Sequence, residues 1–303
     1  MTEQTLEGTQ DFWSRRTVHN GDVALAVFEA GNPDRRTLVL VHGWPDTHLL
    51  WTGVARLLAD DFRLVAYDTR GQGESDEPED DAAYELTQLA QDFRTVVDSV
   101  SPEAPVHVLA HDWGSVEVWE AVTTPEHAAR VASFTSISGP DLDHLAQWGR
   151  ERLTHLDLGG VPRLLEQAAA SAYTAFFVSP LAPPAFRLLG SRSLWEQLLQ
   201  RVEGVEPSPE HHGPTLQHDM VSGLRRYRAN LLARGRRPDP RRTSVPVLQL
   251  IPTRDVAVRS AAVRASEPWT DRLERQEVPY GHWVPLSHPD VVADAVRGFT
   301  ARV

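Results

Sequence analysis

The chain has 303 residues, of which 41% are hydrophobic and 24% are charged, and its formal net charge is -12. This length and apolar content suffice for one large α/β domain or for a domain with an insertion. The negative charge, which no basic stripe interrupts, disfavours a nucleic-acid partner, and the absence of cysteine excludes disulfides and thiolate metal sites.

We expect neither a membrane span nor a secretory signal. No stretch approaches the roughly 20 consecutive apolar residues that a membrane-spanning helix needs. The N-terminal segment, MTEQTLEGTQDFW, is acidic and polar, unlike a signal peptide. We therefore expect a soluble protein of the cytoplasm.

Predicted strands alternate with predicted helices along most of the chain. The segment 15–31 has the pattern of two strands joined at Asn20-Gly21, a dipeptide typical of hairpin turns. Further strands are predicted at 37–43, 62–68, 106–112, 131–138, 245–252 and 273–279, and helices at 85–100, 115–123, 259–266 and 289–300. This alternation predicts a mostly parallel sheet of eight strands with helices on both faces and the hairpin at one edge.

The alternation stops between residues 140 and 243. This stretch has helical patterns, such as LLEQAAASAYTAFF and SLWEQLLQRV, interrupted by segments rich in Pro and Gly. The simplest interpretation is a helical cap, or lid, of residues 140–243 inserted into a core of residues 1–139 and 244–303. The alternative is a continuous core with poorly patterned strands.

Asp112 is the central residue of AHDWG, directly after a predicted strand and before a predicted helix. Ala110 and Gly114 are small, as a tight strand-to-helix turn requires, and such a turn projects its central side chain above the sheet edge. Many hydrolases place a nucleophilic serine there. Considered alone, Asp112 could also be an ordinary N-cap of the helix.

Two further residues complete the order of a catalytic triad. Asp255 follows the strand 245–252, and His282 follows the last strand. Asp112, Asp255 and His282 therefore occur in the order nucleophile, acid, histidine that α/β-hydrolases use. Each is unremarkable alone, but three such residues at strand ends in this order are hard to obtain by chance.

The loop VHGWPD (41–46) is predicted to turn back over the sheet edge. The backbone amide of Trp44 would then join that of Trp113 as an oxyanion hole, with His42 holding the loop in place. The segment DTRGQGESD (68–76) lacks the third glycine of a dinucleotide-binding loop and is interpreted as a turn that shapes the pocket rim.

A group of polar residues in the cap could suggest a metal site. The two adjacent histidines are unsuited to ligating one ion together, so the group is interpreted as part of a solvated lid loop. Its members are His211, His212, His218 and Asp219.

The successive motifs HGWPD, DTRGQGESD, HDWG, PTRD and GHWVPLSHP resemble those of α/β-hydrolase-fold epoxide hydrolases over essentially the whole chain. In the cap, SAYTAFFVSP resembles the segment with the family's first lid tyrosine, which matches Tyr173. GLRRYRANL resembles the helix with the second, which matches Tyr227, although Arg225 and Arg226 replace the usual Asn-aromatic pair. Without this resemblance, each tyrosine could be an ordinary amphipathic residue with a surface hydroxyl.

The resemblance implies an α/β-hydrolase fold and a two-step reaction. Asp112 would open an epoxide and form an alkyl ester, while Tyr173 and Tyr227 hydrogen-bond the epoxide oxygen. Water activated by His282, which Asp255 orients, would then hydrolyse the ester to a vicinal diol. The residues expected to line the substrate pocket are Trp44, Trp113, Phe177 and Trp283.

The expected partners are water and a small apolar epoxide, because the cap is rich in Trp, Phe, Leu and Ala. The reaction needs no metal and no organic cofactor. Hydrolase modules of this kind also occur fused to a C-terminal short-chain dehydrogenase domain, so such an extension is left open. The oligomeric state is open too, since the cap or the edge strand could pair two subunits into a homodimer.

Three alternative functions are kept. A haloalkane dehalogenase would use the same aspartate, but it needs side-chain N–H donors around the halide: Trp113 and one of Trp44, Trp148 and Trp195. An esterase would use Ser115, which lies three residues past the apex of the turn and so outside the usual nucleophile position. A non-catalytic protein that binds a small apolar ligand could share the scaffold.

Overall fold

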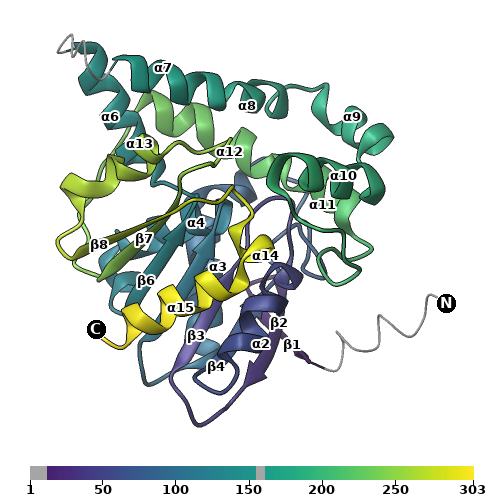
Figure 1. Cartoon of the computed structure of the whole chain (residues 1–303), viewed down its shortest axis with the longest axis vertical. Coiled ribbons are helices and arrows are strands. Elements are labelled where there is room, and N and C mark those ends of the chain that lie inside the picture. Colours follow the sequence, from purple (N-terminus) through teal and green to yellow (C-terminus); the bar gives the residue numbers. More distant parts are fainter. Residues whose placement is uncertain (1–11, 155–160) are drawn as a thin grey trace.

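A single sheet of eight strands forms the centre of the molecule (Figure 1). The computed structural model describes residues 12–154 and 161–303. The strand order is β1-β2-β4-β3-β5-β6-β7-β8. Their bounds are β1 Ser14–Asn20, β2 Val23–Gly31, β3 Thr37–Val41, β4 Arg63–Tyr67, β5 Val106–His111, β6 Val131–Ile137, β7 Val247–Pro252 and β8 Leu273–Val278.

The sheet is mostly parallel, as predicted. β1 pairs antiparallel with β2, and β2 pairs antiparallel with β4. The other five pairings are parallel. The hairpin between β1 and β2 turns at Gly21, whose φ of +57° is a left-handed conformation that glycine adopts without steric strain.

Helices cover both faces of the sheet, which explains why its central strands are apolar throughout. α3 (Leu86–Val100) and α4 (Trp113–Val122) pack in one apolar layer, and α2 (Thr52–Leu58) and α15 (Pro289–Thr300) pack in the other. β5 is buried at every position. Its side chains alternate between the layers, with Val108 and Ala110 in the first and Leu109 in the second.

Shorter elements complete the core. Their bounds are η1 His48–Trp51, η2 Asp81–Tyr84, α5 Pro125–Ala128, α13 Ser260–Val263, η3 Arg264–Trp269 and α14 Val284–Ser287. The helix predicted at 259–266 is therefore divided between α13 and η3, and Pro268 lies inside the 3-10 turn. α2 was not predicted from the sequence, and it is only seven residues long.

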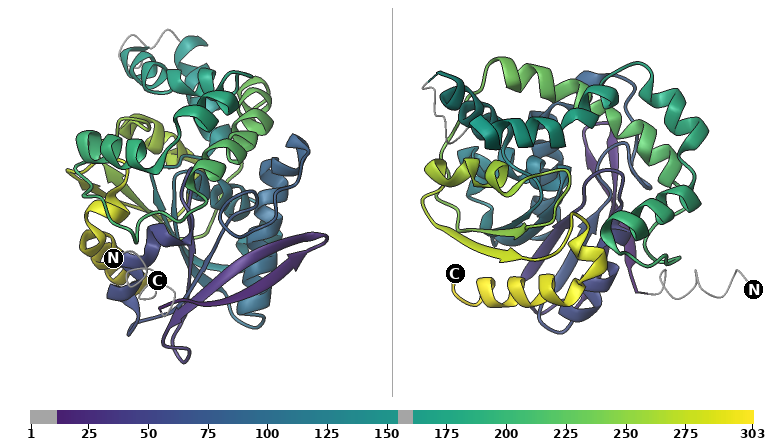
Figure 2. Two further views of the ribbon diagram at one scale, coloured as in Figure 1. Left: turned by 90° about the vertical axis from the view of Figure 1, so that its right-hand side faces the viewer. Right: turned by 45° about the horizontal axis from the view of Figure 1, so that its top comes forward.

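The described residues between β6 and β7 form helices and loops. Their bounds are α6 Leu142–Thr154, α7 Val161–Ala170, α8 Ala172–Phe177, α9 Ala182–Leu189, α10 Arg192–Glu203, α11 Leu216–Ser222 and α12 Leu224–Arg236. These helices lie over one end of the sheet (Figures 1 and 2). The assignment of core and cap boundaries at 139/140 and 243/244 stays a prediction.

A third apolar cluster joins this helical layer to the end of the sheet. It combines Trp44 and Trp113, which follow β3 and β5, with Phe177, Leu199 and Tyr227 of α8, α10 and α12. Across the described residues, no helix has the length and apolar character that crossing a bilayer requires.

The loop 68–76 connects the sheet to the helical layer. Asp68 accepts hydrogen bonds from the backbone amides of His48 at 2.8 Å and Glu74 at 2.9 Å. The backbone N–H of Gly73 donates to Asp219 of α11 at 2.8 Å. Asp68, Gly73 and Glu74 line a cavity beside His48 and His212, and the predicted role of the loop at the rim of the substrate pocket stays a prediction.

We expect Leu109→Ala to lower the free energy of unfolding by about 2–5 kcal/mol, because it leaves a cavity between the sheet and its helices. Leu188→Ala is the matched control: Leu109 is 0% exposed and Leu188 is 80% exposed, so the control should change stability by less than about 0.5 kcal/mol. Urea unfolding measures both, and equal losses would contradict the assignment of the core.

Candidate active site

Asp112 lies at the turn between β5 and α4, with φ of 50° and ψ of -126°. A positive φ is strained for a residue with a side chain, and such strain clusters at functional sites. Small neighbours make the turn possible. A Cβ on Gly114 would overlap the backbone carbonyls of Val41 and His42, and one on Gly139 would overlap the carbonyl of Asp112.

Two backbone amides hold the Asp112 carboxylate. The N–H of Trp44 donates to Oδ2 at 2.8 Å, and the N–H of Trp113 also donates to the carboxylate. A Cβ on Gly43 would overlap Oδ2, so glycine is needed for this close approach. The amides predicted as an oxyanion hole therefore both face Asp112.

The structure brings Asp112, Asp255 and His282 together from the turns after β5, β7 and β8. His282 Nδ1 lies 2.9 Å from Asp255 Oδ2. On the other side of the ring, Nε2 lies 3.8 Å from Asp112 Oδ1, which is too long for a hydrogen bond. Asp255 Oδ1 accepts from the amides of Ala257 and Val258, both at 2.8 Å.

Charge and burial set the protonation of this group. Burial raises the pKa of Asp112. Burial alone would lower the pKa of His282, but Asp255, then Asp112 and Glu203, raise it to about 9. Burial opposes ionisation of Asp255, but His282 keeps the pKa of that carboxyl below its usual value. At neutral pH, His282 is therefore an imidazolium beside the ionised carboxylate of Asp255.

Tyr173 of α8 and Tyr227 of α12 line the same pocket as Asp112. Tyr227 is 3% exposed and Tyr173 is 37% exposed. Burial, followed by the negative charge of Asp112 and other neighbours, raises the pKa of both phenols. Both hydroxyls therefore keep their protons at neutral pH and can donate hydrogen bonds.

The pocket around Asp112 has a volume of about 270 Å³. The predicted wall residues Trp44, Phe177 and Trp283 line it. Trp113, also predicted there, is not among the described lining residues, so its place in the pocket wall stays a prediction. Its ring packs against Tyr227, with 4.8 Å between the ring centroids, so it supports a pocket residue from behind.

The prediction that His211, His212, His218 and Asp219 belong to a solvated loop is wrong in part. His212 and Asp219 are buried, whereas His218 is exposed. His212 Nε2 accepts a hydrogen bond from Trp195 Nε1 at 3.2 Å and lies 3.5 Å from Asp46 Oδ1. Within residues 12–154 and 161–303, no three His, Cys, Asp or Glu side chains converge as a metal site.

The sequence reasoning missed two carboxylates near His282. Asp46 is buried, and its Oδ2 accepts from Trp283 Nε1 at 3.0 Å. Glu203, the last residue of α10, lines the pocket and accepts from the backbone N–H of Trp283 at 3.3 Å. A signal for Glu203 was available, because the dipole of a helix disfavours a negative charge at its C-terminus.

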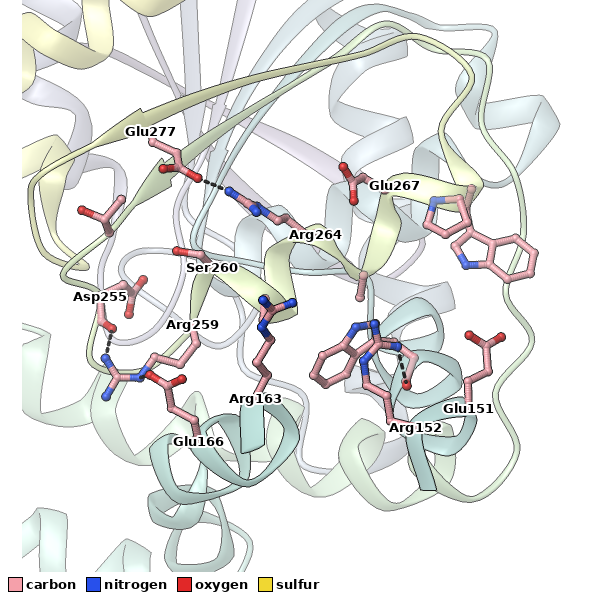
Figure 3. Close-up of a pocket in the computed structure, with 16 residues that line it drawn as sticks. Glu151, Arg152, Arg163, Glu166, Asp255, Arg259, Ser260, Arg264, Glu267 and Glu277 are labelled. Atoms are coloured by element: carbon pink, nitrogen blue, oxygen red, sulfur yellow. Dashed lines mark hydrogen bonds and ion pairs between the residues drawn. The ribbon is translucent and has the colours of Figure 1, made fainter. Parts of the chain in front are cut away.

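A second cavity, of about 630 Å³, has Asp255 among its lining residues (Figure 3). Arginine and glutamate side chains interleave along its walls, and Arg264 pairs with Glu277. Arg259 donates to the backbone carbonyl of Asp255 at 3.0 Å. Neither Asp112 nor the two pocket tyrosines are among its described lining residues, so the predicted chemistry does not belong there.

Residues 36–289 match the model of the alpha/beta hydrolase fold family. A Mycobacterium bovis protein named probable oxidoreductase EphD is 40% identical over 291 residues, which cover 91% of this chain and 48% of that protein. The chain thus spans about half the length of that relative. Epoxide hydrolase A of Mycobacterium tuberculosis is 38% identical over 130 residues, 43% of this chain and 39% of that protein.

Solved structures show the same fold. One described among novel epoxide hydrolases in metagenomes from hot environments has a TM-score of 0.74 at 26% identity, covering 95% of this chain and 98% of its own. An epoxide hydrolase of Bacillus megaterium has a TM-score of 0.77 at 19% identity, with 94% and 100% covered. At that lower identity the likeness concerns the fold alone.

We expect Asp112→Asn to move the titration of the His282 imidazole to lower pH. The wild-type pKa of about 9 depends partly on the charge of Asp112, and removing an anion destabilises the imidazolium. NMR titration of the ring, assigned by comparison with His282→Gln, measures the change. The exposed Asp60→Asn control should leave it unaltered; an unchanged midpoint in Asp112→Asn would contradict the coupling.

Proposed function

Because the chain belongs to the α/β-hydrolase fold family, we propose that it is an epoxide hydrolase that converts an apolar epoxide and water into a vicinal diol. One observation carries this proposal: the carboxylate of Asp112, held by backbone amides, shares a pocket with the hydroxyl-bearing rings of Tyr173 and Tyr227. The similarity to proteins named epoxide hydrolase supports it.

In the first step, Oδ1 of Asp112 attacks an epoxide carbon. A carboxylate is ionised near neutral pH without a base, and its product is an ester that water can cleave. A serine alkoxide would instead leave an ether. The hydroxyls of Tyr173 and Tyr227 hydrogen-bond the epoxide oxygen and stabilise the alkoxide that forms as the ring opens.

Ester formation changes the charge next to the base. Asp112 becomes neutral, so one of the anions that raise the pKa of His282 is lost. The imidazolium then releases its proton more easily, and this release balances the proton that the alkoxide takes up. His282 is thereby activated as a base after the ester exists.

In the second step, neutral His282 removes a proton from water, which attacks Cγ of the ester. Asp255 accepts a hydrogen bond from Nδ1–H and so orients the ring. The developing negative charge falls on Oδ2, which the N–H of Trp44 already faces at 2.8 Å, and the N–H of Trp113 adds a second donor. The tetrahedral intermediate then collapses: the bond from Cγ to the alkyl oxygen breaks, that oxygen takes the remaining proton of the attacking water, and the diol leaves Asp112 as a carboxylate beside the His282 imidazolium.

The contacts of the indole groups disfavour a haloalkane dehalogenase. Trp44 Nε1 donates to the carbonyl of Met220 at 3.0 Å, and Trp195 Nε1 donates to His212. The Trp113 ring packs against that of Tyr227, with 4.8 Å between the centroids. Trp148 lines the second cavity, away from Asp112. The N–H groups of Trp44 and Trp195 are thus occupied and Trp148 lines the other cavity, so Trp113 lacks the second indole donor that a halide site needs.

The esterase alternative is disfavoured as well. Ser115 is fully buried in α4, and its hydroxyl donates to the carbonyl of Gly139 at 2.8 Å. A nucleophile has to face the pocket. A homodimer, a C-terminal short-chain dehydrogenase domain and a cytoplasmic location stay predictions.

We expect His282→Gln to trap the ester on Asp112. The first step does not use the base, whereas hydrolysis does, so the variant should gain the mass of the epoxide after exposure to styrene oxide. Intact and peptide mass spectrometry measure the adduct, and Asp112→Asn should show none. Unmodified Asp112 in a variant whose wild type consumes the epoxide would overturn the two-step mechanism.

Tyr173→Phe and Tyr227→Phe should each slow ester formation by about 10²–10³-fold, because each removes a donor to the developing alkoxide. Single-turnover kinetics with styrene oxide measure this step. Leu198→Ala, a change at an apolar pocket residue, is the control and should have a far smaller effect. Halide release from bromoalkanes without diol from epoxides would instead indicate the dehalogenase.

A further inference from the structure

We propose that Glu203 of α10 is a positioning residue for His282, through which the helical layer over the sheet fixes and tunes the base that hydrolyses the ester. This inference rests on the proposed function, because it assigns Glu203 to the second step. The carboxylate contacts the loop that carries His282, and the ring of that histidine faces Asp112.

The geometry of the loop 281–283 is built around this one carboxylate. The N–H of Trp283 donates to Oε2 at 3.3 Å, and the backbone N–H of His282 helps to lower the pKa of the same carboxyl. A Cβ on Gly281 would overlap Oε2. Three consecutive residues are therefore placed by a side chain that lies almost 80 positions earlier in the chain.

A carboxylate at the position of Glu203 in its helix is electrostatically unfavourable unless it makes contacts outside the helix. α10 ends at this residue, and Gly204 follows in a left-handed conformation with φ of +69°. A helix C-terminus favours cations over carboxylates. Moreover, Oε1 is buried and has no hydrogen-bond partner among the described residues. The two loop amides are the contacts that compensate for this placement.

Four groups with a titratable side chain face His282. Asp255 holds Nδ1, Asp112 lies beside Nε2, and Glu203 holds the backbone. His111 Nε2 lies 2.9 Å from the carbonyl of His282, and its pKa is lowered to about 4 by burial, so it is neutral. Once Asp112 is an ester, Asp255 and Glu203 are the two carboxylates left to stabilise the imidazolium.

The partner loop of the catalytic pair is held in the same way. Gln167 of α7 is buried, and its Nε2 donates to the carbonyl of Ala257 at 3.2 Å. Its Oε1 accepts from the N–H of Arg259 at 2.8 Å. These contacts flank the turn after Asp255. Each of the two loops is thus held by polar contacts from a helix that lies over the sheet, Glu203 of α10 for one and Gln167 of α7 for the other.

Two variants separate the charge of Glu203 from its hydrogen bonds. Glu203→Gln keeps an acceptor for the loop amides but removes the charge, and Glu203→Ala removes both. Glu206→Gln, an exposed change three residues later, is the control. The readout is the single-turnover rate of ester hydrolysis as a function of pH, with ester formation measured in the same traces.

We expect Glu203→Gln to keep the limiting hydrolysis rate within about twofold and to move its pH midpoint downward, because the lost anion no longer stabilises the imidazolium. Glu203→Ala should show the same downward midpoint and, in addition, a limiting hydrolysis rate about tenfold lower, because the ring is misplaced. Neither should slow ester formation. A pH midpoint in Glu203→Gln that coincides with wild type and with Glu206→Gln would overturn the proposal.

A reciprocal substitution tests the contact itself. Gly281→Ala should slow hydrolysis in wild type by forcing Glu203 and the loop apart, and it should cost much less in the Glu203→Ala background, since the clash is gone. Strict additivity of the two losses would contradict a direct interaction. Circular dichroism and melting temperature show whether each variant is folded.

An NMR titration of the His282 ring in Glu203→Gln gives a readout that needs no turnover. We expect the midpoint to move to lower pH, as for the hydrolysis rate. If wild type forms no ester on Asp112 but the titration still moves, the proposed function fails and the coupling of Glu203 to His282 stands. If the ester forms and the titration does not move, the inference about Glu203 fails alone.

Discussion

The hydrogen bond from the N–H of Trp44 to Asp112 Oδ2, together with that from Trp113, is the interaction on which the site depends. It makes the two oxygens of one carboxylate different, because Oδ2 is held by the backbone and Oδ1 is left toward His282. The strained turn at Asp112 and the glycines packed against it serve this arrangement. In the proposed reaction, the same amides that orient the nucleophile later stabilise the charge on its ester.

The charges around His282 explain why one histidine can rest as a cation and act as a base. Its pKa of about 9 reflects Asp255, Asp112 and Glu203 working against burial. In the proposed reaction, ester formation removes the charge of Asp112 at the moment when a neutral base is needed. Two of the three carboxylates come from the strand-end turns of the core, and the third comes from α10, so the helical layer contributes to the electrostatics and not only to the walls of the pocket.

Polar contacts hold the helical layer against the sheet. They explain the two arginines, Arg225 and Arg226, that precede Tyr227. Arg226 is fully buried and donates to Thr69 Oγ1 at 2.9 Å, and the neighbouring Arg225 pairs with Asp81 at 3.0 Å. A buried charge needs such partners to be tolerated. The two arginines that replace the expected pair before Tyr227 therefore tie α12 to the core loops, which places its tyrosine over Asp112 by a different set of contacts.

The amino-acid sequence by itself determined the strand and helix alternation, the antiparallel hairpin, the turn at Asp112 and the order of Asp112, Asp255 and His282. These features are local: they follow from hydrophobic periodicity and from small residues at fixed spacing. Only the tertiary structure decided the roles of residues whose partners are far away in the chain. The contact of Glu203 with the His282 loop, the burial of His212 and Asp219, and the occupied indoles of Trp44 and Trp195 depend on how α10 and α11 pack on the sheet. No local pattern encodes these contacts, because each is made by two segments that meet only when the helical layer closes over the strand ends.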